Sequence, residues 1–355
     1  MKTNILITTG GSGGHVVPAE ILNDHLKDQF NVFTSTDHRG LKYFNKDKSN
    51  LIILDTPRLN LNLLIFFKIF KIFYLVLKSY FFLKKNKIKK VFSTGGYMSL
   101  PICISAKLLK LEIYLLEPNL ILGRANRFFL NFCNKIFLYT KELKNFPQKF
   151  EHKIRIITPL VRKKFYDDKL QKKNSDKFCI LVVGGSQGAK IFEDMIYNVM
   201  IKLPKTDEIK IIQQTQFNNI ENLKKNYDHM KIENYIFDFD DNFNDLIFQS
   251  DLCITRAGAS TLAELSKMNK PFLAVPLATA KDNHQFENAR YYEKLNCCWI
   301  MSQKNFNSDN LEKFLKNILN DKSSYNIKKD NLKKLNFQNS WNNVNQKLLN
   351  IINEN

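Results

Sequence analysis

Near its start the chain reads Ile5-Leu6-Ile7-Thr8-Thr9-Gly10-Gly11-Ser12-Gly13-Gly14-His15, an apolar segment that runs into a glycine-rich turn. The same order of features recurs at Ile180-Leu181-Val182-Val183-Gly184-Gly185-Ser186-Gln187-Gly188-Ala189, close to half the chain of 355 residues further on. Each stretch predicts a buried strand, a tight turn and a helix start, where backbone N–H groups and the helix dipole can hold a phosphate. We therefore expect two nucleotide-fold domains that face a shared cleft.

Neither glycine loop has the spacing of a familiar fingerprint. The first lacks G-x-G-x-x-G, and in the second Gly188 is followed by Ala189 and Lys190 rather than by the Lys-Ser/Thr of a P-loop. This argues against a dinucleotide oxidoreductase and a P-loop kinase. The alternative is that the glycines only let each helix pack tightly on its strand, and the doubling of the pattern favours the binding interpretation.

Size and composition fit a two-domain protein of a reducing compartment. A chain of 355 residues exceeds what one core usually organises, and 44% of its residues are hydrophobic. The six cysteines form no C-x-x-C pair and several lie in apolar runs, which is typical of buried thiols. The formal net charge of +20 favours an anionic partner, either nucleic acid, a membrane surface or a phosphate-rich substrate.

Strand-like runs alternate with helical stretches along the whole chain, which predicts an α/β fold with parallel sheets. The expected strands cover 4–9, 31–36, 51–54, 89–94, 112–117, 135–139, 153–158, 178–184, 208–214, 232–237, 251–255, 271–276 and 296–300. We place the domains at 1–161 and 162–335, and expect 336–355 to form a final helix that returns to the first domain.

Residues 61–90 combine apolar and aromatic residues with lysines. At helical spacing Lys71, Lys78 and Lys85 share one face, and a basic run follows. The lysines interrupt the segment too often for a membrane span, but they suit an interfacial anchor on anionic lipid headgroups. An ordinary core-facing helix with its lysines outward is the alternative.

Polar residues and glycines gather where the expected strands end. Residues 93–97, 117–119, 256–264 and 282–289 each follow a strand and so belong to the expected binding crevice. A carboxylate at Glu264 can accept both hydroxyls of a ribose, while its structural alternative is a capping-box partner of Ser260 or Thr261.

These clusters together resemble the MurG family of UDP-N-acetylglucosamine transferases, which convert lipid I to lipid II. The matching motifs occur in order: GGSGGHVVPA (10–19), STGGY (93–97), EPNLILGRANR (117–127), GGSQGA (184–189), RAGASTLAE (256–264) and HQFENA (284–289). The resemblance implies the GT-B architecture, in which the first Rossmann-like domain binds mainly the acceptor and the second mainly the nucleotide sugar.

The resemblance also implies roles for individual residues. On the donor side, Ser186, Gln187 and Gly188 face the diphosphate, the backbone of Ala259, Ser260, Thr261, Leu262 and Ala263 lies near nucleotide and phosphate, Glu264 holds the ribose, Gln285 and Asn288 bind GlcNAc hydroxyls, and the Phe239 backbone meets uracil. Across the cleft, Ser12, Gly13, Gly14 and Asn119 face the sugar and acceptor, and Arg162 lies at the hinge.

The chain departs from the family pattern at two places. Pro118 stands where the family usually has Gln, and Thr158-Pro159-Leu160-Val161 replaces Gly-Asn-Pro before the hinge arginine. The acceptor side is therefore less well specified than the donor side. Asp238-Phe239-Asp240 mimics a D-x-D metal motif, but we interpret it as a turn, with no metal or other cofactor required and stimulation by Mg²⁺ left open.

The activity that we expect is inverting transfer of GlcNAc from UDP-GlcNAc to the C4 hydroxyl of MurNAc in undecaprenyl-pyrophosphoryl-MurNAc-pentapeptide, lipid I. The site of action is the cytoplasmic face of the bacterial inner membrane, with residues 61–90 on its anionic surface. His15 is the candidate base or acceptor-orienting group and Glu117 the second candidate, although His15 at a helix start can also simply donate to a loop carbonyl.

Two other functions compete with this interpretation. A different GT-B glycolipid transferase, such as one that makes glycosyl diacylglycerols, would share most of the motifs. The charge of +20 would also suit a nucleic-acid-binding protein, but we recognise no nucleic-acid-binding module and expect no nucleic acid partner.

Overall fold

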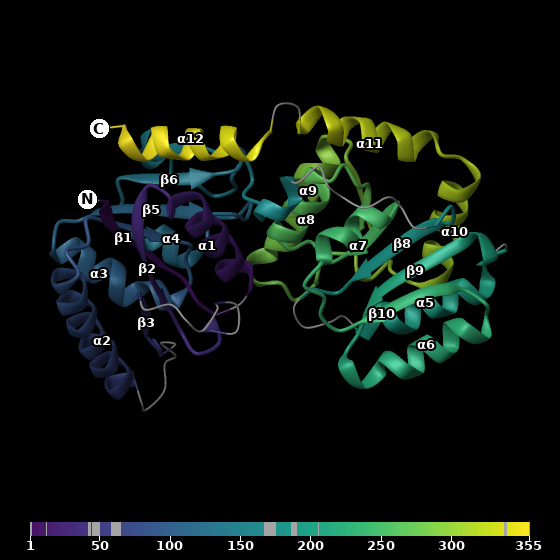
Figure 1. Cartoon of the computed structure of the whole chain (residues 1–355), viewed down its shortest axis with the longest axis horizontal. Coiled ribbons are helices and arrows are strands. Elements are labelled where there is room, and N and C mark those ends of the chain that lie inside the picture. Colours follow the sequence, from purple (N-terminus) through teal and green to yellow (C-terminus); the bar gives the residue numbers. More distant parts are fainter. Residues whose placement is uncertain are drawn as a thin grey trace. The chain divides into compact units, whose positions relative to one another are not determined.

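The computed structural model describes most of the chain and divides it into two compact units (Figure 1). Its described residues are 2–11, 13–41, 44, 50–57, 65–166, 175–185, 190–204, 206–336 and 339–354, except for the side chain of Lys281. Unit 1 comprises Met1–Lys163 and Asn339–Asn355, and unit 2 comprises Lys164–Gln338. The C-terminal segment therefore belongs to the same unit as the N-terminus.

Unit 1 contains a parallel sheet that has seven strands in the described residues, in the order β3-β2-β1-β4-β5-β6-β7. The strands are β1 (Thr3–Thr8), β2 (Phe30–Thr36), β3 (Leu51–Ile53), β4 (Lys90–Ser93), β5 (Glu112–Glu117), β6 (Lys135–Leu138) and β7 (Ile154–Ile156). The central strands are buried along most of their length because helices cover the sheet, which explains their nearly continuous apolar sequences.

The α-helices of unit 1 are α1 (Gly13–Leu26), α2 (Ile65–Lys85), α3 (Leu100–Leu108), α4 (Arg124–Phe129) and α12 (Trp341–Asn353), with a 3-10 turn η2 (Tyr97–Ser99) before α3. The loops that follow β1, β4 and β5 lead into α1, α3 and α4. Pro101 stands in the first turn of α3, where its missing N–H costs no helical hydrogen bond. The hydrophobic core of unit 1 lies between the sheet and the helices that cover it.

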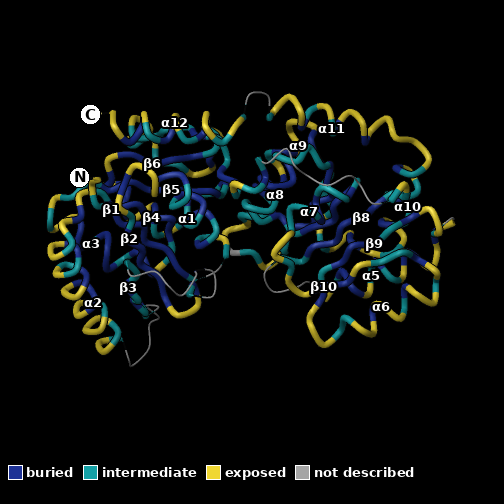
Figure 2. Tube along the Cα trace, in the orientation of Figure 1, coloured by how far each residue is buried: buried dark blue, intermediate teal, exposed yellow. Residues whose placement is uncertain are grey.

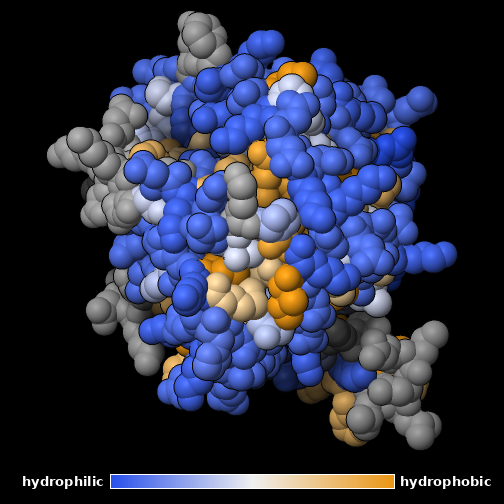
Figure 3. Space-filling model, turned by 90° about the vertical axis from the view of Figure 1, so that its right-hand side faces the viewer, coloured by the Kyte–Doolittle hydropathy of each residue, from blue (hydrophilic) through white to orange (hydrophobic). Residues whose placement is uncertain are grey.

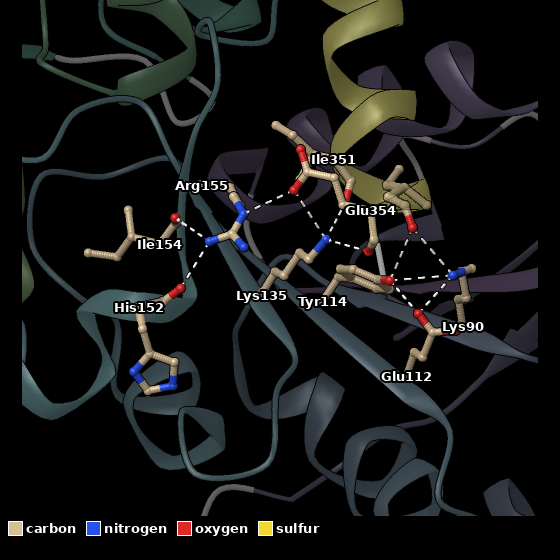
Figure 4. A network of polar contacts seen from close by, with 10 residues as sticks. Lys90, Glu112, Tyr114, Lys135, His152, Ile154, Arg155, Ile351 and Glu354 are labelled. Atoms are coloured by element: carbon tan, nitrogen blue, oxygen red, sulfur yellow. Dashed lines mark hydrogen bonds and ion pairs between the residues drawn. The ribbon is translucent and has the colours of Figure 1, made fainter.

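The C-terminal end of α12 is held by lysines from the sheet (Figure 4). The Lys135 ammonium donates to the carbonyl oxygens of Ile351 at 2.6 Å and Glu354 at 2.7 Å, and Lys90 Nζ lies 3.4 Å from the Ile352 carbonyl oxygen. These carbonyls end the helix without partners further along it, so cations stabilise them. The last helix is thereby fixed on the sheet of unit 1.

The other end of α12 packs on α1 through a stacked pair of rings. The centroids of His25 and Trp341 lie 3.7 Å apart with an interplanar angle of 14°. His25 is buried, and burial lowers the pKa of its imidazole to about 4 against an opposing effect of the Asp24 charge. The ring is therefore neutral at physiological pH.

Unit 2 repeats the plan with a parallel sheet that has six strands in the described part of the chain, in the order β10-β9-β8-β11-β12-β13. Its strands are β8 (Phe178–Val183), β9 (Ile209–Gln214), β10 (Glu233–Phe237), β11 (Leu252–Thr255), β12 (Phe272–Ala274) and β13 (Cys298–Ile300). Its helices are α5 (Lys190–Lys202), α6 (Ile220–His229), α7 (Phe243–Gln249), α8 (Ala259–Lys267), α9 (His284–Lys294), α10 (Ser308–Asn320) and α11 (Ser323–Leu335).

The strand predictions and the fold class are confirmed. Every strand-like run of the sequence overlaps a strand of the structure, and both sheets are parallel. The six cysteines are buried and free, as their apolar surroundings indicated. Burial raises the pKa of the Cys133 and Cys297 thiols to about 11, so these groups stay protonated and unreactive.

Candidate active site

The first glycine loop joins β1 to α1 with a backbone that only glycine adopts easily. Gly10 and Gly11 have φ values of 153° and 86°. A Cβ on Gly10 would lie 2.6 Å from Cγ of Met98 and 2.9 Å from Oδ1 of Asp37, so the loop passes closer to its neighbours than any side chain allows. Ser12 lies outside the described residues, and Gly13 and Gly14 begin α1.

Asp37, just after β2, fixes the conformation of this loop. Its Oδ1 accepts hydrogen bonds from the N–H of Gly11 at 2.9 Å and of Gly40 at 3.0 Å, and its Oδ2 accepts one from Arg39 Nε at 2.8 Å. Burial alone would raise the pKa of this carboxyl, but these hydrogen bonds and the Arg39 charge outweigh it and lower the pKa. Sequence reasoning missed Asp37, which is a charged anchor for the loop.

His15 in the first turn of α1 is tied to the neighbouring loop after β4. Its Nδ1 lies 2.8 Å from the carbonyl oxygen of Thr94. A carbonyl only accepts, so Nδ1 carries the hydrogen and a neutral ring keeps its lone pair on Nε2. Gly96, whose φ of 81° favours glycine, lies beside this edge of the ring, because a Cβ built on it would be 3.8 Å from Nε2. The hydrogen bond to Thr94 thus ties His15 to the neighbouring loop and also gives its ring the tautomer that a general base requires.

Glu117 at the end of β5 organises the loop that follows it. The carboxylate is 2% exposed and accepts N–H groups from Gly123 at 2.8 Å, from the Asn126 side chain at 3.0 Å, and from the backbone and side chain of Asn119 at 3.2 and 3.1 Å. With four donors, its oxygens serve to shape the loop and to hold Asn119. The geometry therefore favours His15 over Glu117 as the proton acceptor.

On unit 2, the loop after β11 leads into α8, which carries Glu264. Gly258 is the N-cap and no side chain caps the helix, so Glu264 lies in the second turn and not at the capping-box position. The capping-box alternative is therefore wrong. Glu264 is 3% exposed. The open N–H groups of the first turn belong to Ala259, Ser260 and Thr261, because Leu262 already donates to Gly258 and Ala263 lies within the helix.

The two amides on α9 each brace a neighbouring loop. The Gln285 side-chain oxygen accepts the N–H of Leu277 at 2.9 Å, and the Asn288 side-chain nitrogen donates to the carbonyl oxygen of Ala257 at 3.1 Å. Asn288 is 1% exposed and thus links α9 to the loop that precedes α8. The structure therefore joins α9 to the loop that leads into α8, the helix that carries Glu264, and the roles of these three side chains stay predictions.

Phe239 follows β10 and is 78% exposed. The turn after it is held by Asp240, whose carboxylate accepts the Asn242 N–H at 2.7 Å and the Tyr235 hydroxyl at 2.8 Å. The D-x-D sequence is thus part of a hydrogen-bonded turn. Nowhere among the described residues do three or more His, Cys, Asp or Glu side chains gather as metal ligands would.

The remaining expected site residues lie at the ends of the described segments. In the second glycine loop Gly185 has a φ of 84°, while Ser186, Gln187 and Gly188 lie outside the described residues. Arg162 is half-buried near the end of the first segment of unit 1.

Helix α2 exposes a surface that we call the aromatic face. Its exposed residues are Phe66, Phe67, Ile69, Phe70, Phe73, Tyr74, Leu77 and Phe81, and Phe66 is 79% exposed. The buried positions are confined to Leu75, Val76, Ser79 and Leu83. Along the α2 tube in Figure 2, exposed stretches alternate with buried and intermediate ones. By contrast, hydrophilic residues cover most of the surface shown in Figure 3. Among the described helices, none has the length and apolarity to cross a bilayer.

Comparisons with known proteins match the chain to glycosyltransferases over most or all of its length. The glycosyltransferase family 28 N-terminal domain matches residues 5–138 and its C-terminal domain matches residues 179–344. A Pelagibacter ubique protein named UDP-N-acetylglucosamine–N-acetylmuramyl-(pentapeptide) pyrophosphoryl-undecaprenol N-acetylglucosamine transferase is 49% identical, over all of both chains. The chain belongs to the MurG family of glycosyltransferases.

A second relative agrees with this assignment, and two solved structures share the fold. A Rickettsia bellii protein of the same name is 34% identical, over 93% of this chain and 95% of its own. The crystal structure of Acinetobacter baumannii MurG superposes with a TM-score of 0.79 at 21% identity, covering 99% of each chain. UDP-GlcNAc 2-epimerase from Neisseria meningitidis, solved with UDP-GlcNAc bound, has a TM-score of 0.68 at 14% identity and covers 99% of this chain and all of its own. These two structures show the shared GT-B fold.

Proposed function

We propose that this chain transfers GlcNAc from UDP-GlcNAc to the C4 hydroxyl of MurNAc in lipid I, which yields lipid II and UDP. The observation that carries the proposal is the 49% identity, over the full length of both chains, to a transferase named for this reaction. The hydroxyl attacks the anomeric carbon while the diphosphate leaves, so the anomeric configuration inverts. The protein must activate a weak nucleophile and stabilise a leaving anion.

Unit 2 binds the donor in this proposal. The open N–H groups of Ala259, Ser260 and Thr261 at the start of α8 donate to the diphosphate, where the helix dipole also favours negative charge. Glu264, one turn further along, accepts the two ribose hydroxyls. Gln285 and Asn288 offer amide groups to the GlcNAc hydroxyls while they brace the loops at 277 and 257. No resident metal is part of the proposal, and Mg²⁺ would act on the diphosphate alone.

Unit 1 binds the acceptor and supplies the base. The Thr94 carbonyl holds His15 in the tautomer whose Nε2 can accept the proton of the MurNAc hydroxyl. Asn119, positioned by Glu117, offers an amide beside the same strand edge. The backbone of Gly13 and Gly14 opens α1 with N–H groups that have no helical partner.

The lipid tail of the acceptor requires a membrane, and α2 suits that surface. The aromatic face can enter the headgroup region while Lys71, Lys78 and Lys85 meet anionic lipids. In this proposal the protein acts peripherally, on the cytoplasmic face of the inner membrane. The exposure of α2 supports this docking mode, because more of its large apolar side chains are exposed than are buried.

A UDP-release assay with UDP-GlcNAc tests the proposal when it is run with a lipid I analogue, with diacylglycerol and with no acceptor. Release that depends on lipid I supports it. Release with diacylglycerol instead would indicate a glycosyl-diacylglycerol synthase, and salt-dependent RNA binding without any donor turnover would indicate a nucleic-acid-binding protein.

A further inference from the structure

Arg39 lies beside the first glycine loop, in an arrangement that no sequence motif indicated. A Cβ added to Gly11 would lie 3.7 Å from Arg39 Nη2, so the guanidinium faces the backbone of the loop. The Arg39 side chain is 54% exposed, whereas its partner Asp37 is 3% exposed. The cation therefore borders solvent at the carboxyl edge of the sheet, next to the residues that lead into His15.

The buried carboxylate fixes this arginine without using up its donors. Asp37 accepts Arg39 Nε at 2.8 Å and the Gly11 N–H at 2.9 Å, so one anchor holds both the cation and the loop. Among the described residues, Asp37 is the only hydrogen-bonding partner of Arg39, and it takes Nε and leaves both terminal nitrogens without a partner there. An arginine held in this way is prepared to bind a planar or tetrahedral anion through two parallel N–H groups.

The proposed acceptor, lipid I, carries an anion of this kind, its pyrophosphate, close to the hydroxyl that reacts. In lipid I the pyrophosphate is attached to the anomeric carbon of MurNAc, one sugar ring away from the C4 hydroxyl. His15 and Gly11 lie on the same short segment, so a ring whose C4 hydroxyl meets His15 can present its pyrophosphate to the Gly11 side of the loop. The donor diphosphate, by contrast, is assigned to unit 2.

We propose that Arg39 binds the pyrophosphate of the acceptor and thereby positions the MurNAc hydroxyl for attack. This inference rests on the proposed function, because it presupposes a pyrophosphoryl-linked acceptor. It makes Arg39 a residue that distinguishes lipid I from glycolipids without a pyrophosphate, such as diacylglycerols.

Steady-state kinetics of Arg39→Ala and Arg39→Lys test the inference. We expect Arg39→Ala to raise KM for a lipid I analogue about ten- to a hundredfold and to leave KM for UDP-GlcNAc within about twofold. Arg39→Lys should recover part of the loss, because it keeps the charge but not the fork of donors. Lys110→Ala removes an exposed positive charge at the opposite edge of the sheet and should change neither constant.

A second measurement uses farnesyl pyrophosphate as a competitive inhibitor against the lipid I analogue. Its inhibition constant should rise in Arg39→Ala by a factor similar to that of KM, whereas farnesyl monophosphate should show a smaller change. Unchanged acceptor KM and inhibition in the folded variant would overturn the inference, and so would a rise in KM for UDP-GlcNAc alone, which would assign Arg39 to the donor. Absence of transfer by the wild-type protein would instead refute the proposed function.

Discussion

The Nδ1 atom of His15 lies 2.8 Å from the carbonyl oxygen of Thr94, which joins the first turn of α1 to the loop after β4. Two glycine-containing loops that are distant in sequence are thus connected through one imidazole. The bond fixes both the ring orientation and the tautomer, so Nε2 is the ring nitrogen that carries the lone pair of a neutral imidazole. In the proposed function, the contact that orients the candidate base His15 is therefore the same contact that joins the two loops.

Replacement of His15 by alanine should reduce turnover by at least about tenfold, because general base catalysis contributes about 10² to 10⁴ in rate. The affinity for UDP-GlcNAc should stay almost unchanged, because unit 2 supplies the expected donor contacts. Single-turnover kinetics and isothermal titration with UDP-GlcNAc measure the two quantities. Turnover near the wild-type value, with chemistry rate-limiting, would remove His15 from the mechanism and direct attention to Asn119 and Glu117.

Replacement of Glu264 by alanine should weaken UDP-GlcNAc binding by about 1 to 3 kcal/mol, as expected when hydrogen bonds to a charged group are lost. Calorimetric titration of UDP and UDP-GlcNAc measures this change. Glu221→Ala, an exposed carboxylate of α6, is the matched control and should bind like the wild type. If the Glu264 variant is folded and retains full donor affinity, the carboxylate has only a structural role within α8.

Binding to vesicles should depend both on the lysines of α2 and on its aromatic face. Cosedimentation with anionic vesicles should fall when Lys71, Lys78 and Lys85 are changed together to Glu. Each lysine near an anionic surface contributes about 1 kcal/mol to the free energy of binding. Phe66, Phe67 and Phe70 changed to Ser should lower it with less dependence on salt. The control is the same charge change at Lys224, Lys225 and Lys231, which are exposed on unit 2. Equal binding by all variants would make α2 a plain structural helix.

His25 should make the stability of unit 1 pH-dependent. Its pKa is about 4 in the folded protein, because of burial, against an ordinary value of 6.5. Between these values the unfolded chain binds a proton that the folded chain does not, so stability is lost as the pH falls from about 6.5 to about 4. At pH 5 the loss should be about 2 kcal/mol.

Urea unfolding at pH 7 and pH 5 measures this loss. In His25→Phe, which can still stack on Trp341, the part of the pH dependence due to the imidazole should disappear. His229→Phe, at the exposed end of α6, is the matched control and should behave like the wild type. An unaltered pH dependence in His25→Phe would show that the buried ring does not resist protonation.

The sequence predicted the parts of the fold that depend on local pattern. Strands such as β5, expected at 112–117 and found at Glu112–Glu117, are apolar runs bounded by turns, and the glycine loops have their own signature. The role of Asp37 was not predictable in this way, because its bond to Gly11 joins residues 26 positions apart. Such pairs become visible only when the order of strands is known.

Other features were ambiguous because they depend on helix boundaries or on neighbouring elements. The sequence alone allowed Glu264 to be a capping-box partner of Ser260 or Thr261, and the N-cap at Gly258 removes that possibility. For α2, both alternatives fitted the same spacing of lysines, since spacing alone does not tell which face a sheet covers. The packing of α2 leaves Phe70 73% exposed, which no periodicity could have established.

The most direct test of the central claim is the mass of the product formed from UDP-GlcNAc and a lipid I analogue by the purified chain. The account predicts a product heavier than the acceptor by one N-acetylhexosamine residue, formed in equal amount with released UDP and reduced at least about tenfold in His15→Ala at matched times. A chain that is folded and binds UDP-GlcNAc, yet attaches no sugar to lipid I, would contradict it.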